Sequence, residues 1–465
     1  MASVDFYSNS PEKREFCGVI GVYSKTGKDV ATALYQGMLA LQHRGQDAAG
    51  LAIWNNKFVE KKGLGLVSDV FCEQDLRIKG RVGIGHTRYP TTGTCMMSDV
   101  QPFISNNIAI SHNGQVSNYK ELRGSIEKKG VKFISSVDSE VAAAIISEEL
   151  AKGSRFEKSV SAFMNAADGA YTIAGILEGA LFAFKDPNGI RPMVWGESED
   201  FIIFASETVA LDVNDAVRRG DIKGGELAIV KNGKVEITPL VKEKPAICMF
   251  EYVYFSRPDS VINNKEVFKI RENLGVELAR EHPAQADIVI EVPDSARNAA
   301  HAYAKTLGIP HAEGLIKNRY IGRTFIMPSQ QKRKNAVKMK LNVIKSVVAG
   351  KRVALIDDSI VRGTTLKEIV GMLKHAGATE VHVRITCPPI IAPCFYGIDM
   401  STYEELVAHE KSVPEIGKYL GADSLGYLSI GGLKKVIGLP VCTGCLNKDY
   451  PTDCAKKLAG EQGKW

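Results

Sequence analysis

Val353-Ala-Leu-Ile-Asp-Asp-Ser-Ile-Val-Arg-Gly-Thr-Thr365 is the stretch of sequence that decides the fold of this 465-residue chain. Its first four residues are apolar and predict a buried strand of a parallel sheet. The apolar spacing after Thr365 predicts a helix that ends near Gly377. Ligands of open α/β sheets bind at the carboxyl ends of the strands. A turn of small residues there can bind a phosphate through backbone N–H groups, and the adjacent Asp357 and Asp358 can meet ribose hydroxyls or a hydrated Mg²⁺. We therefore expect a phosphate-sugar site at this turn, with a solvated turn as the alternative.

This stretch closely resembles the phosphoribosyl-pyrophosphate (PRPP) loop of type I phosphoribosyltransferases. The resemblance implies that the turn binds the 5-phosphate of PRPP through backbone amides and the residues Gly363, Thr364 and Thr365. It also implies that Asp357 and Asp358 bind PRPP and, together with Ser295, hold a Mg²⁺ ion shared with its pyrophosphate. The long basic segment 317–340 resembles the lid that closes over PRPP in this family, and a solvated basic face is its alternative.

The two halves of the chain have different patterns. Residues 17–240 contain short strands and hairpins, among them 18–23, 51–54, 81–85, 108–111, 171–177 and 226–230, with amphipathic helices at 30–42, 140–150 and 158–167. This pattern predicts an α+β fold with an antiparallel sheet. After the charged, proline-containing stretch 242–245, the pattern becomes strand–helix–strand, with strands at 287–292, 353–356 and 381–386, and predicts a parallel α/β sheet. The region beyond about 395 reads as a loop-rich tail with helical pieces.

Composition narrows the class of protein. Hydrophobic residues make up 45% and charged residues 24% of the chain, as in globular proteins, and no apolar run is long enough to span a membrane. The net charge of +6 suits an anionic small substrate and falls short of a nucleic-acid-binding footprint. The polar first sixteen residues do not resemble a signal peptide, so we expect a cytoplasmic protein. Nine cysteines then favour thiol chemistry or metal binding over disulfides.

An ordered set of motifs follows Cys17 in the first half: 41–50 (LQHRGQDAAG), 86–89 (HTRY), 112–114 (HNG) and 136–140 (SVDSE). Together they resemble the glutamine amidotransferase domain of the N-terminal-nucleophile hydrolases. The resemblance implies that Cys17 is the nucleophile, that Asn113 and Gly114 stabilise the oxyanion, and that Arg88 and Asp138 bind the α-carboxylate and α-ammonium of glutamine. The free α-amine of such a cysteine can serve as its base, so the three histidines of these motifs are expected to be structural.

This mechanism requires a free amine on Cys17, so residues 1–16 are expected to be a propeptide. The residue before the cysteine is Phe16, whereas an acidic residue would be expected at that place in leader-bearing relatives.

Four other cysteines form a candidate metal site. Cys442 and Cys445 make a CxxC pair, and Cys248 and Cys394 bring the number of thiolates to four, which suits one cubane iron–sulfur cluster or a Cys₄ zinc site. A redox pair is a weaker alternative, since no thioredoxin-like unit is evident, and Cys387 is the rival to Cys394. Thiolate number does not choose between the metals. The four cysteines resemble the ligand set of the iron–sulfur-bearing amidophosphoribosyltransferases, and this resemblance implies a structural [4Fe–4S] cluster at these four positions.

The whole chain after residue 16 resembles the amidophosphoribosyltransferase family. The resemblance implies the first committed step of purine synthesis: glutamine and PRPP give 5-phosphoribosylamine, glutamate and pyrophosphate, and ammonia passes between two sites. It also implies purine nucleotide inhibitors and a homotetramer. The expected domains are a propeptide (1–16), an N-terminal-nucleophile domain (17–245), a type I phosphoribosyltransferase domain (246–395) and a tail (396–465). The alternatives are a sugar-phosphate amidotransferase, which would lack the stretch 353–365, and a non-catalytic PRPP-sensing regulator, which would have no reason to retain Cys17 and its motifs.

Overall fold

The structure is a computed structural model that describes residues 17–89, 96–318, 340–400 and 402–461. The expected propeptide, Cys95 and most of the expected lid lie outside the described residues. No helix among the described residues is both long enough and apolar enough to cross a membrane.

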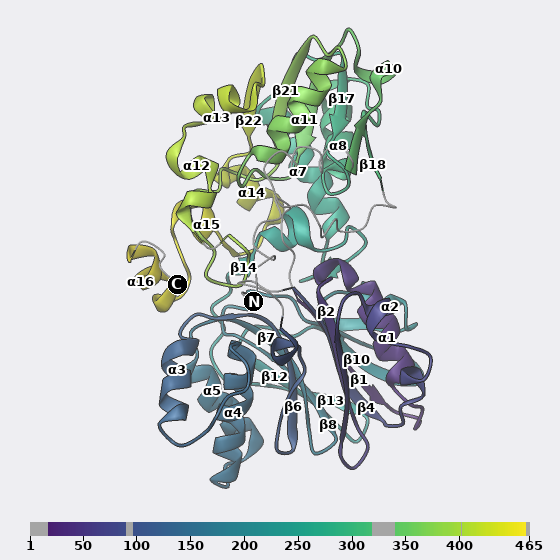
Figure 1. Cartoon of the computed structure of the whole chain (residues 1–465), viewed down its shortest axis with the longest axis vertical. Coiled ribbons are helices and arrows are strands. Elements are labelled where there is room, and N and C mark those ends of the chain that lie inside the picture. The colour runs from purple at the N-terminus through teal and green to yellow at the C-terminus, as the bar shows by residue number, and fades with distance from the viewer. Residues whose placement is uncertain (1–16, 90–95, 319–339, 401, 462–465) are drawn as a thin grey trace, which may run out of the picture.

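The first half is built from two antiparallel sheets that lie face to face (Figure 1). The first sheet has the order β11 (Val217–Asp221), β9 (Val194–Glu197), β10 (Phe201–Ala205), β1 (Gly18–Ser24), β4 (Val82–Arg88), β2 (Ala48–Trp54) and β3 (Phe58–Leu64). The second has the order β13 (Lys234–Pro239), β12 (Glu226–Lys231), β8 (Ala180–Lys185), β7 (Gly169–Leu177), β6 (Ile108–Val116) and β5 (Phe103–Ser105). Apolar side chains of both sheets, such as Ile84 and Ile176, form one buried core between them.

Helices cover the outer face of each sheet. The helix α1 (Ala31–Ala40) packs on the first sheet, and α4 (Asp138–Ala151) and α5 (Phe156–Ala166) pack with α3 (Tyr119–Glu127) on the second. The result is an αββα arrangement, which agrees with the α+β fold and antiparallel pairing expected from the sequence and with the αββα layers that the N-terminal-nucleophile resemblance implies. The turn Asn232-Gly233, in which both residues have positive φ, joins β12 to β13 as expected for a two-residue hairpin.

The second half contains a four-stranded parallel sheet, in the order β17 (Ile288–Glu291), β20 (Arg352–Asp357), β21 (Glu380–Ile385) and β22 (Ser424–Tyr427). The helix α7 (Val267–Glu281) packs against α8 (Arg297–Leu307) and α14 (Ile430–Ile437), and α11 (Thr364–His375) packs against α13 (Val413–Leu420). Gly377 has a positive φ just after α11, in agreement with the expected helix end. The first three strands and the parallel sheet are as the sequence predicts.

The fourth strand was not foreseen. The sequence analysis places β22 in the tail, but β22 pairs with β21 and completes the parallel sheet. Its four residues, Ser-Leu-Gly-Tyr, show neither a continuous apolar run nor a clear alternation, which explains why the pattern does not reveal a strand.

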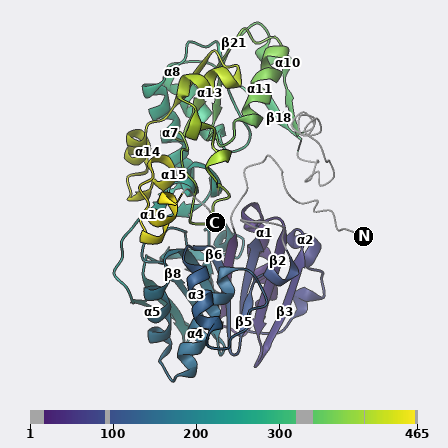
Figure 2. The ribbon, with the colours of Figure 1, turned by 60° about the vertical axis from the view of Figure 1, so that its left-hand side comes forward.

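The tail then returns to the junction between the two halves. The short strand β23 (Val441–Cys442) pairs in parallel with β14 (Ile247–Cys248), which follows the first domain directly. The final helix α16 (Asp453–Gly460) lies beside the first domain, where the N–H of Cys454 donates to Asp168 (Figure 2). The junction is therefore built from three distant parts of the sequence.

Candidate active sites and a cysteine cage

Cys17 comes directly before β1 in the first sheet. β1 pairs with β4 so that Gly18 is opposite Thr87, which brings Cys17 beside Arg88. The Sγ atom of Cys17 lies 3.8 Å from the carbonyl oxygen of Tyr89. Burial raises the pKa of the Cys17 thiol, and the positive charge of Arg88 partly opposes this rise. The thiol is therefore protonated near neutral pH and needs a base to become a nucleophile.

Arg88 and Asp138 both act electrostatically on Cys17, as expected for two residues of one site. Arg88 ends β4 and is 7% exposed, and its guanidinium lies 3.9 Å from Asp99. Asp138 begins α4 and accepts the N–H of Val116 at 2.7 Å. Burial opposes ionisation of Asp138, but His112 and this N–H together hold the pKa of Asp138 below its ordinary value. A cation and an anion are thus available for the two charges of an amino acid.

Asn113 and Gly114 lie on β6, in the second sheet. Both side-chain amide atoms of Asn113 are buried and have no hydrogen-bond partner within the described part of the chain. Gly114 has a φ of +134°, a backbone conformation that favours glycine. A buried amide with an unused donor is what an oxyanion-stabilising group offers before substrate binds.

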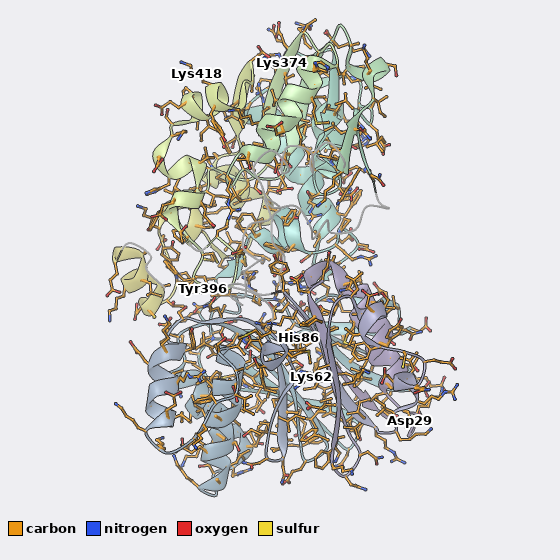
Figure 3. The ribbon with its side chains drawn as sticks, viewed as in Figure 1. Asp29, Lys62, His86, Lys374, Tyr396 and Lys418 are labelled. Carbon is orange, nitrogen blue, oxygen red and sulfur yellow. The ribbon has the colours of Figure 1, made fainter. Side chains whose placement is uncertain are left out.

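The two sheets are joined near this site by a histidine. The Nε2 atom of His86 lies 3.0 Å from the carbonyl oxygen of His112, the residue before Asn113. Burial, reinforced by the charge of Arg88, lowers the pKa of His86 to about 3, so this ring is neutral. His86 is seen inside the lower domain in Figure 3, below the junction where Tyr396 lies. Its contact supports a structural role, as the sequence analysis expects.

A buried charge network behind Cys17 was missed by the sequence analysis. Arg44 donates through Nε to the carbonyl oxygen of Cys17 at 3.4 Å, through Nη1 to Glu207, and through Nη2 to Glu251 at 2.8 Å. Arg44, Glu207 and Glu251 are each at most 1% exposed. Arg44 lies within the motif 41–50, but its position in the sequence gives no sign that it meets Glu207 and Glu251.

The second candidate site lies at the carboxyl ends of β17 and β20. Ser295 follows β17 and donates its hydroxyl hydrogen to Asp358, which follows β20. The N–H of Asp358 donates to the carboxylate of Asp357 at 2.8 Å, and the Ser359 hydroxyl donates to Asp358 at 2.6 Å. The structure therefore brings together all three residues that the family resemblance assigns to Mg²⁺.

The turn between β20 and α11 is the one that the sequence analysis expects to bind a phosphate. Gly363 has a φ of +74° and stands at the N-cap of α11, and Thr364 and Thr365 form its first turn. A twelve-residue helix has a positive dipole end and free N–H groups at its start. Arg362 pairs with Glu405 of the tail, which ties this turn to the end of the chain.

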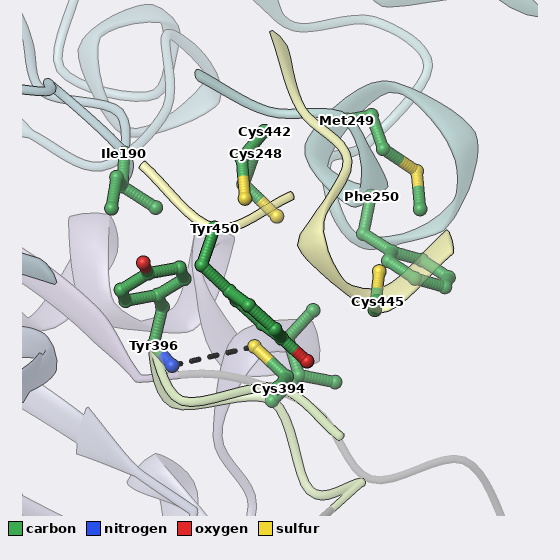
Figure 4. Close-up of a pocket in the computed structure, with 10 residues that line it drawn as sticks. Ile190, Cys248, Met249, Phe250, Cys394, Tyr396, Cys442, Cys445 and Tyr450 are labelled. Atoms are coloured by element: carbon green, nitrogen blue, oxygen red, sulfur yellow. Dashed lines mark hydrogen bonds between the residues drawn. The ribbon is translucent and has the colours of Figure 1, made fainter. Parts of the chain in front are cut away.

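Four cysteines surround one cavity at the junction, and we call Cys248, Cys394, Cys442 and Cys445 the cysteine cage (Figure 4). Aromatic and aliphatic side chains complete the cavity lining, among them Phe250, Tyr396 and Tyr450. Cys387 is buried but does not line this cavity, so the geometry favours Cys394 over its rival. Burial raises the pKa of all four thiols, that of Cys248 to about 11.

Two groups of side chains offer metal ligands: the cysteine cage, and the cluster of Ser295, Asp357 and Asp358. No group of three or more His, Cys, Asp or Glu side chains among the described residues could hold a single metal ion. Four thiols around one cavity match the ligand number of a [4Fe–4S] cluster and of a Cys₄ zinc site. Two carboxylates and a hydroxyl fit Mg²⁺, which is usually completed by substrate phosphates and water.

The comparisons with known proteins agree with this geometry. Residues 86–213 match the family model described as "Glutamine amidotransferase domain". Curated amidophosphoribosyltransferases of Methanothermobacter thermautotrophicus and Methanocaldococcus jannaschii are 47% and 46% identical to this chain. The matches cover 95% of this chain and 95% of the first relative, and 96% of this chain and all of the second. The chain belongs to the amidophosphoribosyltransferase family.

A solved amidophosphoribosyltransferase shares the fold over almost the whole chain. It is the glutamine PRPP amidotransferase of B. subtilis in complex with ADP and GMP. The two structures superpose with a TM-score of 0.88 at 42% sequence identity, and the match covers 94% of this chain and 98% of the relative. A second solved structure, described as the allosteric regulatory enzyme of purine biosynthesis, gives a TM-score of 0.89 at 42% identity and covers 97% and 99%. Because the chain belongs to the amidophosphoribosyltransferase family, it is an enzyme and not a non-catalytic regulator.

Proposed function

We propose that this chain makes 5-phosphoribosylamine from PRPP and glutamine, releasing glutamate and pyrophosphate, with Cys17 as the nucleophile of the glutamine half. The observation that carries the proposal is the assembly around Cys17: Arg88 and Asp138 close enough to act on its pKa, and the unpartnered amide of Asn113 on the facing sheet. Family membership supplies the overall reaction.

In the glutamine half, Arg88 binds the substrate α-carboxylate and Asp138 its α-ammonium. The α-amine of Cys17, freed by removal of residues 1–16, takes the thiol proton as the sulfur attacks the carboxamide carbon. The Asn113 amide and the Gly114 N–H stabilise the resulting oxyanion. The C–N bond then breaks, ammonia leaves, and water hydrolyses the glutamyl thioester to glutamate.

In the phosphoribosyl half, the first turn of α11, with Gly363, Thr364 and Thr365, binds the 5-phosphate of PRPP. Asp357 and Asp358 orient the ribose, and together with Ser295 they would hold a Mg²⁺ ion, which would supply positive charge to stabilise the pyrophosphate leaving group. Ammonia from the first site forms a bond to C1 of PRPP as the C1–O bond to pyrophosphate breaks. The product is unstable in water, and free ammonia escapes easily into it. An enclosed path between the two sites therefore favours coupling of glutamine hydrolysis to the phosphoribosyl transfer.

Further parts of the proposal concern cofactor and assembly. The cysteine cage would hold a structural [4Fe–4S] cluster, and four thiols around one cavity, three of them in buried residues, support this assignment. Its role is to join β14 to the tail, with no electron transfer during turnover. Purine nucleotides inhibit the enzyme, and the complex of the B. subtilis relative with ADP and GMP supports this part of the proposal. The proposed assembly is the homotetramer that the family resemblance implies. The first domain runs from 17 to 245, and the second begins at 246 and extends beyond 395, because the tail strand β22 completes its parallel sheet.

The test is pyrophosphate release by anaerobically purified enzyme with Mg²⁺ and PRPP, with glutamine added or omitted. We expect release only when glutamine or ammonia is present, and we expect Cys17→Ala to abolish the glutamine reaction while keeping the ammonia reaction. The intact mass of the purified chain reports removal of residues 1–16. Full glutamine-dependent activity with these residues retained would contradict the propeptide, and no pyrophosphate release with either nitrogen source would contradict the function.

A further inference from the structure

The loop that carries Cys394 of the cysteine cage also touches the glutamine site, and we call residues 394–399 the Cys394 loop. The hydroxyl of Ser117, just after β6, donates to the carbonyl oxygen of Phe395 at 3.0 Å. A methyl group at Gly397 would lie 3.1 Å from the carbonyl carbon and the carbonyl oxygen of Gly114. The loop backbone is therefore in close contact with the proposed oxyanion-stabilising glycine.

The same loop has a second, longer connection to Cys17. Arg191 donates through Nη2 to the carbonyl oxygen of Tyr396 at 2.7 Å and through Nη1 to Glu251 at 3.4 Å. Glu251 accepts from Arg44, which in turn donates to the carbonyl oxygen of Cys17. Arg191 and Glu251 are fully buried, so each of these charges depends on the others for its partners.

The loop itself is held in a fixed shape. The N–H of Cys394 donates to the carbonyl oxygen of Met400 at 2.8 Å and closes the loop. The N–H of Tyr396 donates to the Sγ atom of Cys394 at 3.4 Å, as the dashed line in Figure 4 shows. The loop is anchored at the cysteine cage and contacts two parts of the glutamine site. A shift of the cage would therefore move groups in the glutamine site.

We propose that the Cys394 loop is a positioning element for the glutamine site, acting through Gly397 on Gly114 and through Arg191 on Cys17. The inference rests on the proposed function, since it requires Cys17 and Gly114 to be part of a glutamine site. Oxyanion stabilisation depends on donors that are fixed before the reaction, and small misplacements of reacting groups lower the rate strongly. The loop thereby makes glutamine hydrolysis dependent on the cysteine cage, although the cage does not touch glutamine.

The experiment compares Gly397→Ala with Gly308→Ala in the complete enzyme. Both glycines have a positive φ, of 94° and 69°, so both variants carry backbone strain, but a methyl group at Gly308 would meet no atom within 4 Å. For Gly397→Ala we expect kcat of glutamine hydrolysis to fall about 10- to 100-fold, because the Gly114 peptide must shift. KM for glutamine and the ammonia-dependent release of pyrophosphate should each stay within about threefold, because substrate charges and the second site are untouched.

A second variant tests the inference in case Gly397→Ala does not fold. Arg191→Lys keeps the buried charge but removes the planar fork that serves Tyr396 and Glu251 together, and we expect the same selective loss of kcat. Unchanged glutamine hydrolysis in both variants would overturn the inference, and so would equal losses in the glutamine and ammonia reactions or an equal loss in Gly308→Ala. Failure of the unaltered enzyme to use glutamine at all would instead contradict the proposed function.

Discussion

At the scale of single residues, Asn113 is the side chain whose surroundings are hardest to explain without a substrate. A buried amide without partners costs free energy, and proteins usually satisfy such groups. Its position on β6, beside the His112 carbonyl that His86 approaches, holds it rigidly in a place where an oxyanion can form. The cost is understandable if the missing partner is the oxygen of a tetrahedral intermediate.

Replacing Asn113 by Ala should therefore lower kcat for glutamine hydrolysis by about 10²- to 10³-fold, or about 2.7–4 kcal/mol of transition-state stabilisation. Pyrophosphate release with ammonia should be unaffected, because the second site does not use this amide. Steady-state kinetics with each nitrogen source measure both effects. Asn165→Ala, on the exposed side of α5, is the matched control. A loss of less than about threefold would exclude an oxyanion role for Asn113.

The lowered pKa of Asp138 predicts how KM for glutamine responds to pH. Its pKa is lowered, so the carboxylate persists at any pH above its ordinary pKa of about 3.9, and its contribution to stability is lost only as pH falls through the lower folded-state pKa. We expect KM for glutamine to be constant between pH 5 and pH 8 as far as this residue is concerned.

In Asp138→Asn, KM for glutamine should rise about 10- to 100-fold, since a charged hydrogen bond to the α-ammonium contributes about 1.5–3 kcal/mol. Asp453→Asn is the control, because Asp453 also begins a helix but is 97% exposed. A marked increase in KM between pH 6 and pH 5 in the unaltered enzyme, absent from Asp138→Asn, would show that the Asp138 pKa is not lowered.

Single residues with specific chemistry could be predicted from the sequence, whereas buried partners could not. Cys17, Arg88 and Asp138 were found because their motifs occur in a fixed order, and the structure brings them together. Arg44, Glu251 and Arg191 lie in different parts of the chain, and their ion pairs exist only once the two halves meet. Sequence spacing carries no information about such contacts.

At the scale of secondary structure, the function of α11 depends on one glycine. Gly363 adopts a φ of +74° at the N-cap of α11, in the turn that follows β20 and its two acids. An alanine there would carry about 1–2 kcal/mol of strain, and its methyl group would lie 3.2 Å from the ring of Tyr419.

We expect Gly363→Ala to raise KM for PRPP about tenfold, which corresponds to about 1.4 kcal/mol. Glutamine hydrolysis measured without PRPP should be unaffected. Titration with PRPP in the ammonia reaction measures the change. Gly350→Ala, with a φ of +73° and open space around it, is the matched control. Equal effects of the two substitutions would mean that backbone strain alone, rather than the phosphate-binding turn, is responsible.

Elements were predictable where local pattern and packing agree. The strand β20 is a continuous apolar run that is buried in the parallel sheet, and its following helix has clear apolar spacing. The strand β22 was missed because its pairing with β21 is set by the completed sheet and not by its own four residues.

At the scale of the whole molecule, the cysteine cage joins the start of the second half of the chain to the tail. Cys248 begins the second half and Cys442 lies near the end, yet they are opposite each other in the pair β14 and β23. A metal cluster bound here adds its binding free energy to the stability of the junction, because the unfolded chain does not hold the four thiols together.

Cys445→Ser should therefore lose the cluster and destabilise the junction. We expect anaerobically purified enzyme to contain about four irons per chain and the variant to contain almost none, with an unfolding temperature lower by several degrees. Glutamine hydrolysis should be lost with the cluster, because the Cys394 loop would no longer be anchored. Cys72→Ser, at an exposed thiol, is the matched control.

Cys387→Ser separates the two candidate ligand sets, and it should keep the iron because Cys387 does not line the cavity. Metal analysis and thermal unfolding measure both quantities, and activity is not needed to read them. Zinc in place of iron in the unaltered enzyme would contradict the assignment of an iron–sulfur cluster to the cage. Full iron in Cys445→Ser, or its loss in Cys387→Ser, would show that the ligands were assigned wrongly.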